Sequence, residues 1–147
     1  MTTSEANREL VLASYRAFAE QDKDAMTAFF APDAEWVVPQ DNATVVALGQ
    51  RSGFYGRDAI LHYLTDSVNG RLFSEGTVDI QTVLADGDSV MIEQLYKARL
   101  CNGRPYEMVQ VFIYKLRNGQ IAQVRAFFDT KSGQQQIFGD EAPRKLV

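Results

Sequence analysis

The stretch VMIEQLYKARLCNGRPYEMVQVFIYKLRNGQIAQVRAFFD, residues 90–129, decides the fold. Apolar and polar side chains alternate along it in three runs, which is the pattern of half-buried strands. An Asn-Gly pair follows each of the first two runs, and such a pair is a strong signal for a hairpin turn. With an earlier run before it, the stretch predicts an antiparallel meander. Its strands are expected at Thr77–Leu84, Val90–Leu100, Tyr106–Leu116 and Ile121–Asp129, and its turns at Asp86-Gly87-Asp88, Asn102-Gly103 and Asn118-Gly119.

The residues before the meander favour helices. Val11, Tyr15 and Phe18 share one face of a helix expected over about 5–20. Asp22 or Asp24 can cap the next one. After it we expect a strand over Ala34–Val38, an irregular stretch over Gln40–Tyr55 and a third helix opened by Gly56-Arg57-Asp58. Helices followed by a meander predict an α+β fold with the helices on one sheet face.

The length and composition restrict the possibilities further. A chain of 147 residues suits one domain, and 46% hydrophobic residues are enough to offset the entropy of ordering it. We expect a single domain over 1–130 and a polar, loosely held tail over 131–147. A net charge of −4 gives no support for nucleic-acid or membrane binding. One Cys and one His leave no disulfide framework and no histidine metal cluster, so we expect no cofactor and a cytoplasmic location.

Strand parity separates the two faces of the meander, because alternate side chains point to opposite sides. The run Met108–Tyr114 (MVQVFIY) is nearly apolar on both faces, although the helices can cover only one. A second copy of the chain is the economical cover, so we expect a homodimer through the outer face. The inner face is predicted to carry Ile92, Gln94, Tyr96, Met108, Gln110, Phe112, Val124, Ala126 and Phe128.

Short motifs in this order of elements carry a resemblance to a known family. They are Tyr15-x-x-Phe18, Asp22-x-Asp24-Ala25, Phe29-Phe30-Ala31-Pro32-Asp33-Ala34, Tyr55-Gly56-Arg57-Asp58-Ala59-Ile60, Gly103-Arg104-Pro105-Tyr106-Glu107, and Gly119-Gln120-Ile121 with Phe127-Phe128-Asp129. Over about residues 5–130 the chain resembles SnoaL-like, ketosteroid-isomerase-like domains of the nuclear transport factor 2-like superfamily. The resemblance implies a cone: a curved antiparallel sheet packed on three N-terminal helices around one apolar pocket. Such folds host isomerases, cyclases, epoxide hydrolases, dehydratases and non-catalytic binding domains.

The resemblance also suggests roles for particular residues. Tyr15 matches the first-helix tyrosine that donates a hydrogen bond to the enolate in ketosteroid isomerases; its alternative is an ordinary core tyrosine. The family's general base would stand at Val38, before Pro39, and its protonated Asp would stand at Gln110. The Arg and Asp residues of limonene-epoxide-hydrolase-like members fall at Gln94, Tyr96 and Ala126. Neither specific activity is therefore expected.

The expected pocket lining consists of amides and phenols among apolar walls. Two glutamines on one apolar face must be paired, so they form either a structural network or a ligand contact. We expect substrate contacts from Phe18, Trp36, Val38, Gln94, Tyr96, Met108, Gln110, Phe112, Val124, Ala126 and Phe128.

Asp129 and His62 are the candidate proton carriers. SnoaL-like cyclases, which this chain resembles, use an Asp near the end of the last strand. Parity places Asp129 opposite Ala126 and Phe128, where a cap or an ion pair with Arg125 is the alternative. His62 has a suitable pKa, but the helix face of Ile60, Tyr63 and Leu64 turns it toward solvent.

Three hypotheses follow for the function. The first is a cofactor-free enzyme that isomerises, cyclises or dehydrates an apolar, carbonyl- or hydroxyl-bearing, polyketide- or terpenoid-like metabolite through an enolate-like intermediate. Tyr15 would then hold the oxyanion with Gln110 or Tyr96. The second is a binding or accessory protein for such a metabolite. The third is an association domain whose pocket is plugged by its own side chains.

Overall fold

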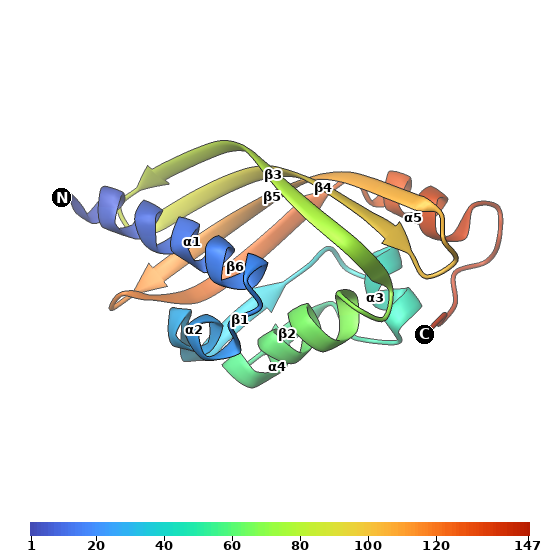
Figure 1. Cartoon of the computed structure of the whole chain (residues 1–147), viewed down its shortest axis with the longest axis horizontal. Helices are drawn as coiled ribbons and strands as arrows, with labels where there is room; N and C mark the ends of the chain where they lie inside the picture. Colours follow the sequence, from blue (N-terminus) through green and yellow to red (C-terminus); the bar gives the residue numbers. More distant parts are fainter.

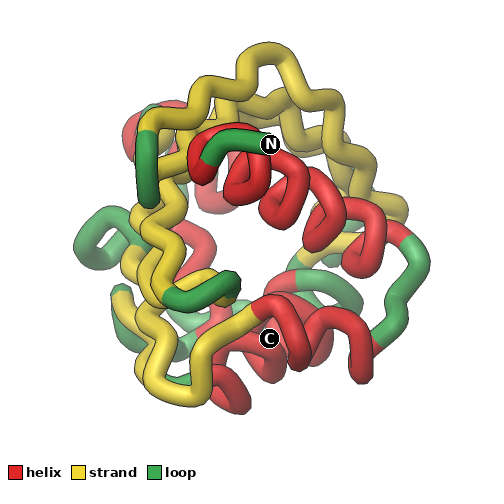
Figure 2. Tube along the Cα trace, turned by 90° about the vertical axis from the view of Figure 1, so that its left-hand side faces the viewer, coloured by secondary structure: helices red, strands yellow, loops and turns green.

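A computed structural model describes the chain from Met1 to Val147. One six-stranded sheet, in the order β2-β1-β6-β5-β4-β3, curves around a layer of helices (Figures 1 and 2). This arrangement confirms the expected α+β cone. The helices are α1 (Thr3–Ala19), α2 (Lys23–Phe29), α3 (Ala43–Leu48), α4 (Arg57–His62), the π-helix η1 (Tyr63–Val68) and α5 (Thr130–Phe138). The strands are β1 (Phe30–Val37), β2 (Gly53–Tyr55), β3 (Phe73–Asp86), β4 (Ser89–Leu100), β5 (Pro105–Arg117) and β6 (Gln120–Phe128).

The meander forms where the alternation predicts it, from β3 to β6. Asn118 and Gly119 both have positive φ, as the tight turn between β5 and β6 requires. At the other Asn-Gly pair only Gly103 has positive φ, and Arg104 continues the wider loop by accepting a bond from Leu100 N. The resulting register sets Gln94 opposite Gln110, so the two inner-face glutamines are neighbours.

The sheet is not antiparallel throughout, because β1 pairs in parallel with β6. Trp36 stands beside Val124 in that pairing, which brings the first strand of the chain next to its last. Hairpin signals act only between consecutive strands, so the sequence could not reveal this long-range pairing. The pairing adds Trp36 to the inner face next to β6.

The segment expected to be irregular, Gln40–Tyr55, contains α3 and β2. The Asn42 side chain caps α3 by accepting a hydrogen bond of 3.0 Å from Thr44 N. Gly49 ends the helix in the left-handed conformation, with φ 66°. Six residues are too few for apolar periodicity to show, so the two caps were the available signals.

The tail expected to be loose over 131–147 begins instead with the helix α5 (Thr130–Phe138). Asp129 caps α5 by accepting from Ser132 N at 3.0 Å, and Ile137 and Phe138 are buried. Gln136 pairs with both backbone groups of Glu107, which attaches α5 to β5. The run of three glutamines suggested a solvated tail, but the third of them, Gln136, is hydrogen-bonded to β5. None of the helices is long and apolar enough to span a membrane.

We expect the burial of α5 to contribute to global stability. Phe138 is 2% exposed, so Phe138→Ala should lower the free energy of unfolding by about 3–5 kcal/mol, the usual cost of removing a buried phenyl group. Urea denaturation would measure it, with Gln134→Ala on the exposed side of α5 as the control. A loss below about 1 kcal/mol would show that α5 is not part of the cooperative core.

Candidate functional site

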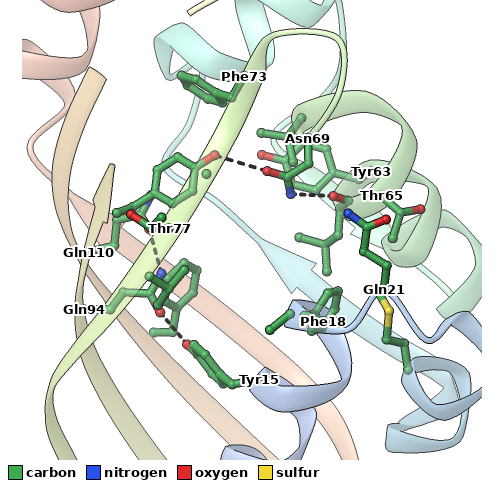
Figure 3. A pocket seen from close by; sticks show the side chains of 18 of the residues that line it. Tyr15, Phe18, Gln21, Tyr63, Thr65, Asn69, Phe73, Thr77, Gln94 and Gln110 are labelled. Carbon is green, nitrogen blue, oxygen red and sulfur yellow. Dashed lines mark hydrogen bonds between the residues drawn. The ribbon is translucent and has the colours of Figure 1, made fainter. Parts of the chain in front are cut away.

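A large cavity lies between the inner face of the sheet, helix α1 and the π-helix η1. Its volume is about 1470 Å³, and aromatic and aliphatic side chains make up most of its wall. Figure 3 shows Tyr15 and Phe18 reaching it from α1, Gln94 and Gln110 from the sheet, and Tyr63 and Thr65 from η1. A π-helical turn is rare and occurs most often near functional sites. The cavity is open rather than plugged, which argues against a pure association domain.

Four polar side chains form one hydrogen-bonded chain along the wall of this cavity. The Tyr114 hydroxyl donates to the Tyr15 oxygen at 3.1 Å, and Tyr15 donates to Gln94 Oε1 at 2.6 Å. Gln94 Nε2 then donates to Gln110 Oε1 at 3.0 Å. We call these residues the amide–phenol chain; Figure 3 labels its members Tyr15, Gln94 and Gln110. Its last member, Gln110, has its own amide nitrogen free of any partner in the protein and lines the cavity.

The phenols of the cavity are held neutral. Burial raises the pKa of Tyr15, and the hydrogen bond with Tyr114 only partly opposes this effect. Burial likewise raises the pKa of Tyr63, Tyr96 and Tyr114 well above the usual range and that of Tyr106 to about 12. Neutral phenols donate hydrogen bonds but do not take up protons, so the wall can supply donors but no base.

Most of the residues expected to contact a substrate do line the cavity. Met108 and Val124 are the exceptions, although both are buried on the inner face. The Met108 side chain ends beside Gly133, so α5 covers it, and Val124 lies beneath other side chains at 0% exposure. The cavity wall includes the other candidate residues from the sequence, which are Tyr15, Phe18, Trp36, Val38, Gln94, Tyr96, Gln110, Phe112, Ala126 and Phe128.

The two candidate proton carriers lie outside the cavity. Asp129 is exposed and its carboxylate caps α5, because β6 ends one residue earlier without the bulge that could turn Asp129 inward. His62 is exposed on α4 and pairs with Asp66 at 3.1 Å, where the π-helix begins and Ile60 and Tyr63 take the buried face. Neither residue lines the cavity.

Several wall residues were not foreseen from the sequence. Tyr114 shares the parity of Gln110 and Phe112, so the alternation of β5 was a sufficient signal for it. Tyr63 was identified only as part of an apolar helix face. Phe73 is the first residue of β3, Thr44 lies in the six-residue helix α3 and Asn69 follows η1, so no periodicity in the sequence indicates the direction of these side chains.

The acidic groups near the cavity stand at its rim. Asp22 caps α2, Asp66 pairs with Lys23 at 3.6 Å, and Glu75 pairs with Arg99 at 2.7 Å. Asp24 completes the set. No group of three or more His, Cys, Asp or Glu side chains is placed to hold a metal ion. The interior therefore offers amides, phenols and apolar walls.

A cone of sheet and helices around one apolar cavity that contains a few polar side chains defines a nuclear transport factor 2-like fold. Within this class, a family model for the SnoaL-like domain matches residues 11–124. The chain therefore belongs to the SnoaL-like family. This confirms the family that the sequence motifs indicated.

Individual relatives agree with this assignment. An uncharacterized protein of Mycobacterium tuberculosis H37Rv is 27% identical over 129 residues, covering 86% of this chain and 91% of the relative. TerC, co-crystallized with polyporic acid, superposes with a TM-score of 0.77 at 23% identity, covering 90% of this chain and 98% of TerC. A protein of Jannaschia sp. CCS1 described as a SnoaL-like polyketide cyclase gives a TM-score of 0.75 at 17% identity and 97% coverage of both chains. At these identities the two structures establish the fold.

The raised pKa values of the buried phenols predict a loss of stability in alkali. An unfolded tyrosine ionises near pH 10, whereas the folded phenols stay protonated to about 12, as for Tyr106. Their contribution to the free energy of unfolding is complete below pH 10 and is lost as the pH rises from about 10 to about 12. The free energy of unfolding should fall by up to about 1.4 kcal/mol per pH unit for each such phenol.

Denaturant unfolding at several pH values, with phenolate absorbance as the second readout, measures this effect. Tyr106→Phe should make the decline less steep, because it removes one of the titrating groups. An unfolding free energy that stays constant from about pH 9 to 11 would contradict the conclusion that the buried phenols stay neutral in the folded protein.

Proposed function

We propose that this protein binds an apolar metabolite through a carbonyl or hydroxyl oxygen and stabilises negative charge that develops on that oxygen. The main evidence for this proposal is the amide–phenol chain, which ends in the free amide nitrogen of Gln110 inside an apolar cavity. Charge stabilisation of this kind serves isomerisation, cyclisation or dehydration through an enolate-like intermediate, without a cofactor.

The chain suits this task because its donors are oriented before a ligand arrives. Each hydrogen bond from Tyr114 to Gln110 polarises the next, which strengthens the final donor. The surrounding wall includes Trp36, Phe112 and Phe128, and a weakly polar environment of this kind makes each donor more effective than it would be in water. Tyr15 therefore acts through Gln94 in this arrangement, as a positioning residue.

The size and character of the cavity support a polyketide- or terpenoid-like ligand. A volume of about 1470 Å³ exceeds the roughly 300–1,000 Å³ of common small-molecule sites. TerC was co-crystallized with polyporic acid, and the Jannaschia relative is described as a polyketide cyclase. Both names agree with an oxygen-bearing organic ligand.

Removal of a proton from the ligand needs an acceptor other than Asp129 and His62. The interior has no carboxylate or imidazole, and the nearest acids stand at the rim, where Asp22, Asp66 and Glu75 already have partners. A ligand whose own C–H or O–H group is acidic needs stabilisation of its anion more than it needs a strong base. We therefore infer that the proton leaves toward the rim and solvent.

Binding without chemistry is the second candidate, and the lack of an interior acid or base favours it. A carrier would hold neutral and anionic forms of a ligand about equally well, whereas an oxyanion site prefers the anion. This difference separates the two functions experimentally.

We further propose that two copies associate through the outer face of the sheet. Val109 and Phe127 are 52% and 47% exposed there, and Leu84 extends the patch. Apolar side chains at this density mark an interaction surface. Glu93, Lys97, Lys115 and Arg125 supply both signs of charge on the same face, so a two-fold contact can pair unlike charges.

The oxyanion proposal predicts that affinity rises with ligand acidity. In a series of fluorinated 2-naphthols, a lower phenol pKa should give tighter binding in calorimetric titrations. Gln110→Glu keeps the acceptor for Gln94 but replaces the free donor by a carboxylate oxygen. It should weaken binding of the most acidic member at least about tenfold, or about 1.4 kcal/mol.

Gln134→Glu, on the exposed side of α5, adds the same charge away from the cavity and should leave the affinities unchanged. Affinities that do not vary with acidity, and that Gln110→Glu does not alter, would leave the carrier function and exclude charge stabilisation by Gln110.

The dimer proposal predicts a sedimentation mass of two 16.5 kDa chains at micromolar concentration. Val109→Lys should shift the mass to one chain, because it places a charge at the centre of the contact. Val78→Lys, at a position that is 46% exposed on the opposite face, is the control and should leave the dimer intact. A single-chain mass for the unmodified protein would overturn the proposal.

A further inference from the structure

A second group of polar side chains lies in the same cavity, apart from the amide–phenol chain. It consists of Tyr63 on η1, Tyr96 on β4 and Tyr106 on β5, which we call the phenol cluster. All three line the cavity, and the Tyr96 and Tyr106 ring centroids are 6.3 Å apart. The function proposed above uses only the amide–phenol chain, so the cluster is available for another contact.

Aromatic packing fixes the three rings. Phe73 packs against Tyr106 at 4.5 Å between centroids and edge-on against Tyr96 at 5.6 Å. Tyr63 stacks on Phe54 at 3.9 Å with an interplanar angle of 17°. Rings held in this way lose little entropy when a ligand binds, so their hydroxyls are preorganised.

The hydroxyl of Tyr63 is the one without a partner. Tyr96 donates to Asn69 Oδ1 at 3.1 Å, and Tyr106 is hydrogen-bonded to the Thr44 side chain. Tyr63 is 6% exposed and lines the cavity, and its hydroxyl forms no hydrogen bond with another residue. Burial, together with the nearby Tyr106 and Tyr96, raises the pKa of Tyr63, so the group remains a donor. A donor that faces the cavity and has no protein partner gains a hydrogen bond when a ligand brings an acceptor to it.

The two polar sites are separated along the same strands. Gln94 and Tyr96 are two residues apart on β4, which is about 7 Å, and Gln110 and Tyr106 are four residues apart on β5, which is about 13 Å. A fused-ring molecule with an oxygen at each end, and a hydrogen bond of about 3 Å from each oxygen, spans a separation of this size. The aromatic walls between the sites offer faces on which flat rings can stack.

The charges around the cavity indicate a ligand without negative charge. Four carboxylates, on Asp22, Asp24, Asp66 and Glu75, stand at the rim against the two cations of Arg16 and Lys23. The interior contains no cation that could pair with a carboxylate or phosphate of the ligand. A group that is fully charged before binding, such as a carboxylate or a phosphate, would therefore lose its hydration there without gaining a counter-ion.

We propose that the ligand is an uncharged fused-ring molecule with oxygen atoms at both ends, one accepting from the Gln110 amide and the other from the Tyr63 hydroxyl. The first contact rests on the proposed function. The second is independent of it and makes Tyr63 a determinant of ligand length and oxygenation. The reaction that supplies such a ligand must deliver it free of a charged carrier group.

Three neutral naphthalenes of equal ring size test this proposal by calorimetry. 2-Naphthol carries one oxygen, 2,6-dihydroxynaphthalene carries one at each end, and 6-methyl-2-naphthol fills the second position without an acceptor. We expect the dihydroxy compound to bind about tenfold more tightly than 2-naphthol, and the methyl compound to lack this gain. 6-Hydroxy-2-naphthoate, which is anionic, should bind more weakly than either.

Tyr63→Phe keeps the stack on Phe54 and should bring the dihydroxy and monohydroxy compounds to equal affinity, while leaving 2-naphthol binding unchanged. Gln110→Leu should weaken 2-naphthol and the dihydroxy compound alike. Tyr55→Phe, which alters an exposed tyrosine outside the cavity, is the matched control and should change nothing.

The two proposals fail in different ways. A tenfold gain that survives Tyr63→Phe, or that 6-methyl-2-naphthol shares, overturns the second contact and leaves the Gln110 site standing. Binding of 2-naphthol that is insensitive to Gln110→Leu overturns the proposed function itself. The ligand comparison uses the unmodified protein, so it decides the second contact even if a variant does not fold.

Discussion

The requirement that buried polar groups be paired governs the arrangement of this cavity. Gln94 is 5% exposed among apolar neighbours, and an amide in that position costs free energy unless both of its ends are satisfied. Its oxygen accepts from Tyr15 and its nitrogen donates to Gln110. The pairing fixes α1 against β4 and β5, because Tyr15 comes from the helix and the glutamines come from the sheet. Once these bonds are made, one donor remains, and it faces the cavity.

This arrangement separates charge stabilisation from proton transfer. In an acid–base site a carboxylate can take up the proton that the ligand loses, but an amide does not titrate and the phenols here are held neutral. The wall therefore offers the same donors over the whole physiological pH range. Any pH dependence of binding at this site must come from the ligand or from the rim acids. The site is best matched to a ligand that ionises easily by itself.

The sequence was informative about the fold because the signals were local. Alternation in β4 and β5 placed Gln94, Gln110 and Tyr96 on one face, and the hairpin turn at Asn102-Gly103 joins the two strands in the register that makes the glutamines neighbours. The parallel pairing of β1 with β6 had no local signal. Neither did the docking of α5, whose Gln136 reads as a solvated residue until Glu107 is known to lie beside it.

The site was predictable only where it lies on regular elements. Parity identified Gln94, Tyr96 and Gln110 on the sheet, and the helical period identified Tyr15 and Phe18. Tyr63 was placed on an apolar face, but the change from α4 to the π-helix η1 at that residue alters the direction of the following side chains. Asp129 was a candidate because of its position in the family pattern, yet its carboxylate caps α5 by accepting a hydrogen bond from the backbone. A carboxylate next to a helix start has such a partner within three residues, and a sequence pattern does not show which one it takes.

The unpaired hydroxyl of Tyr63 and the free amide of Gln110 have the same physical meaning. Donors that face a cavity without a protein partner are free to bond to a ligand, so two such donors in one cavity mark where a ligand can supply acceptors. Apolar walls alone would accept many molecules of similar size. Two donors at a fixed separation select for the spacing of two oxygens, because a ligand that lacks one of them leaves a buried group unsatisfied. In a cavity without fixed interior charge, this spacing is the strongest specificity that the wall can impose.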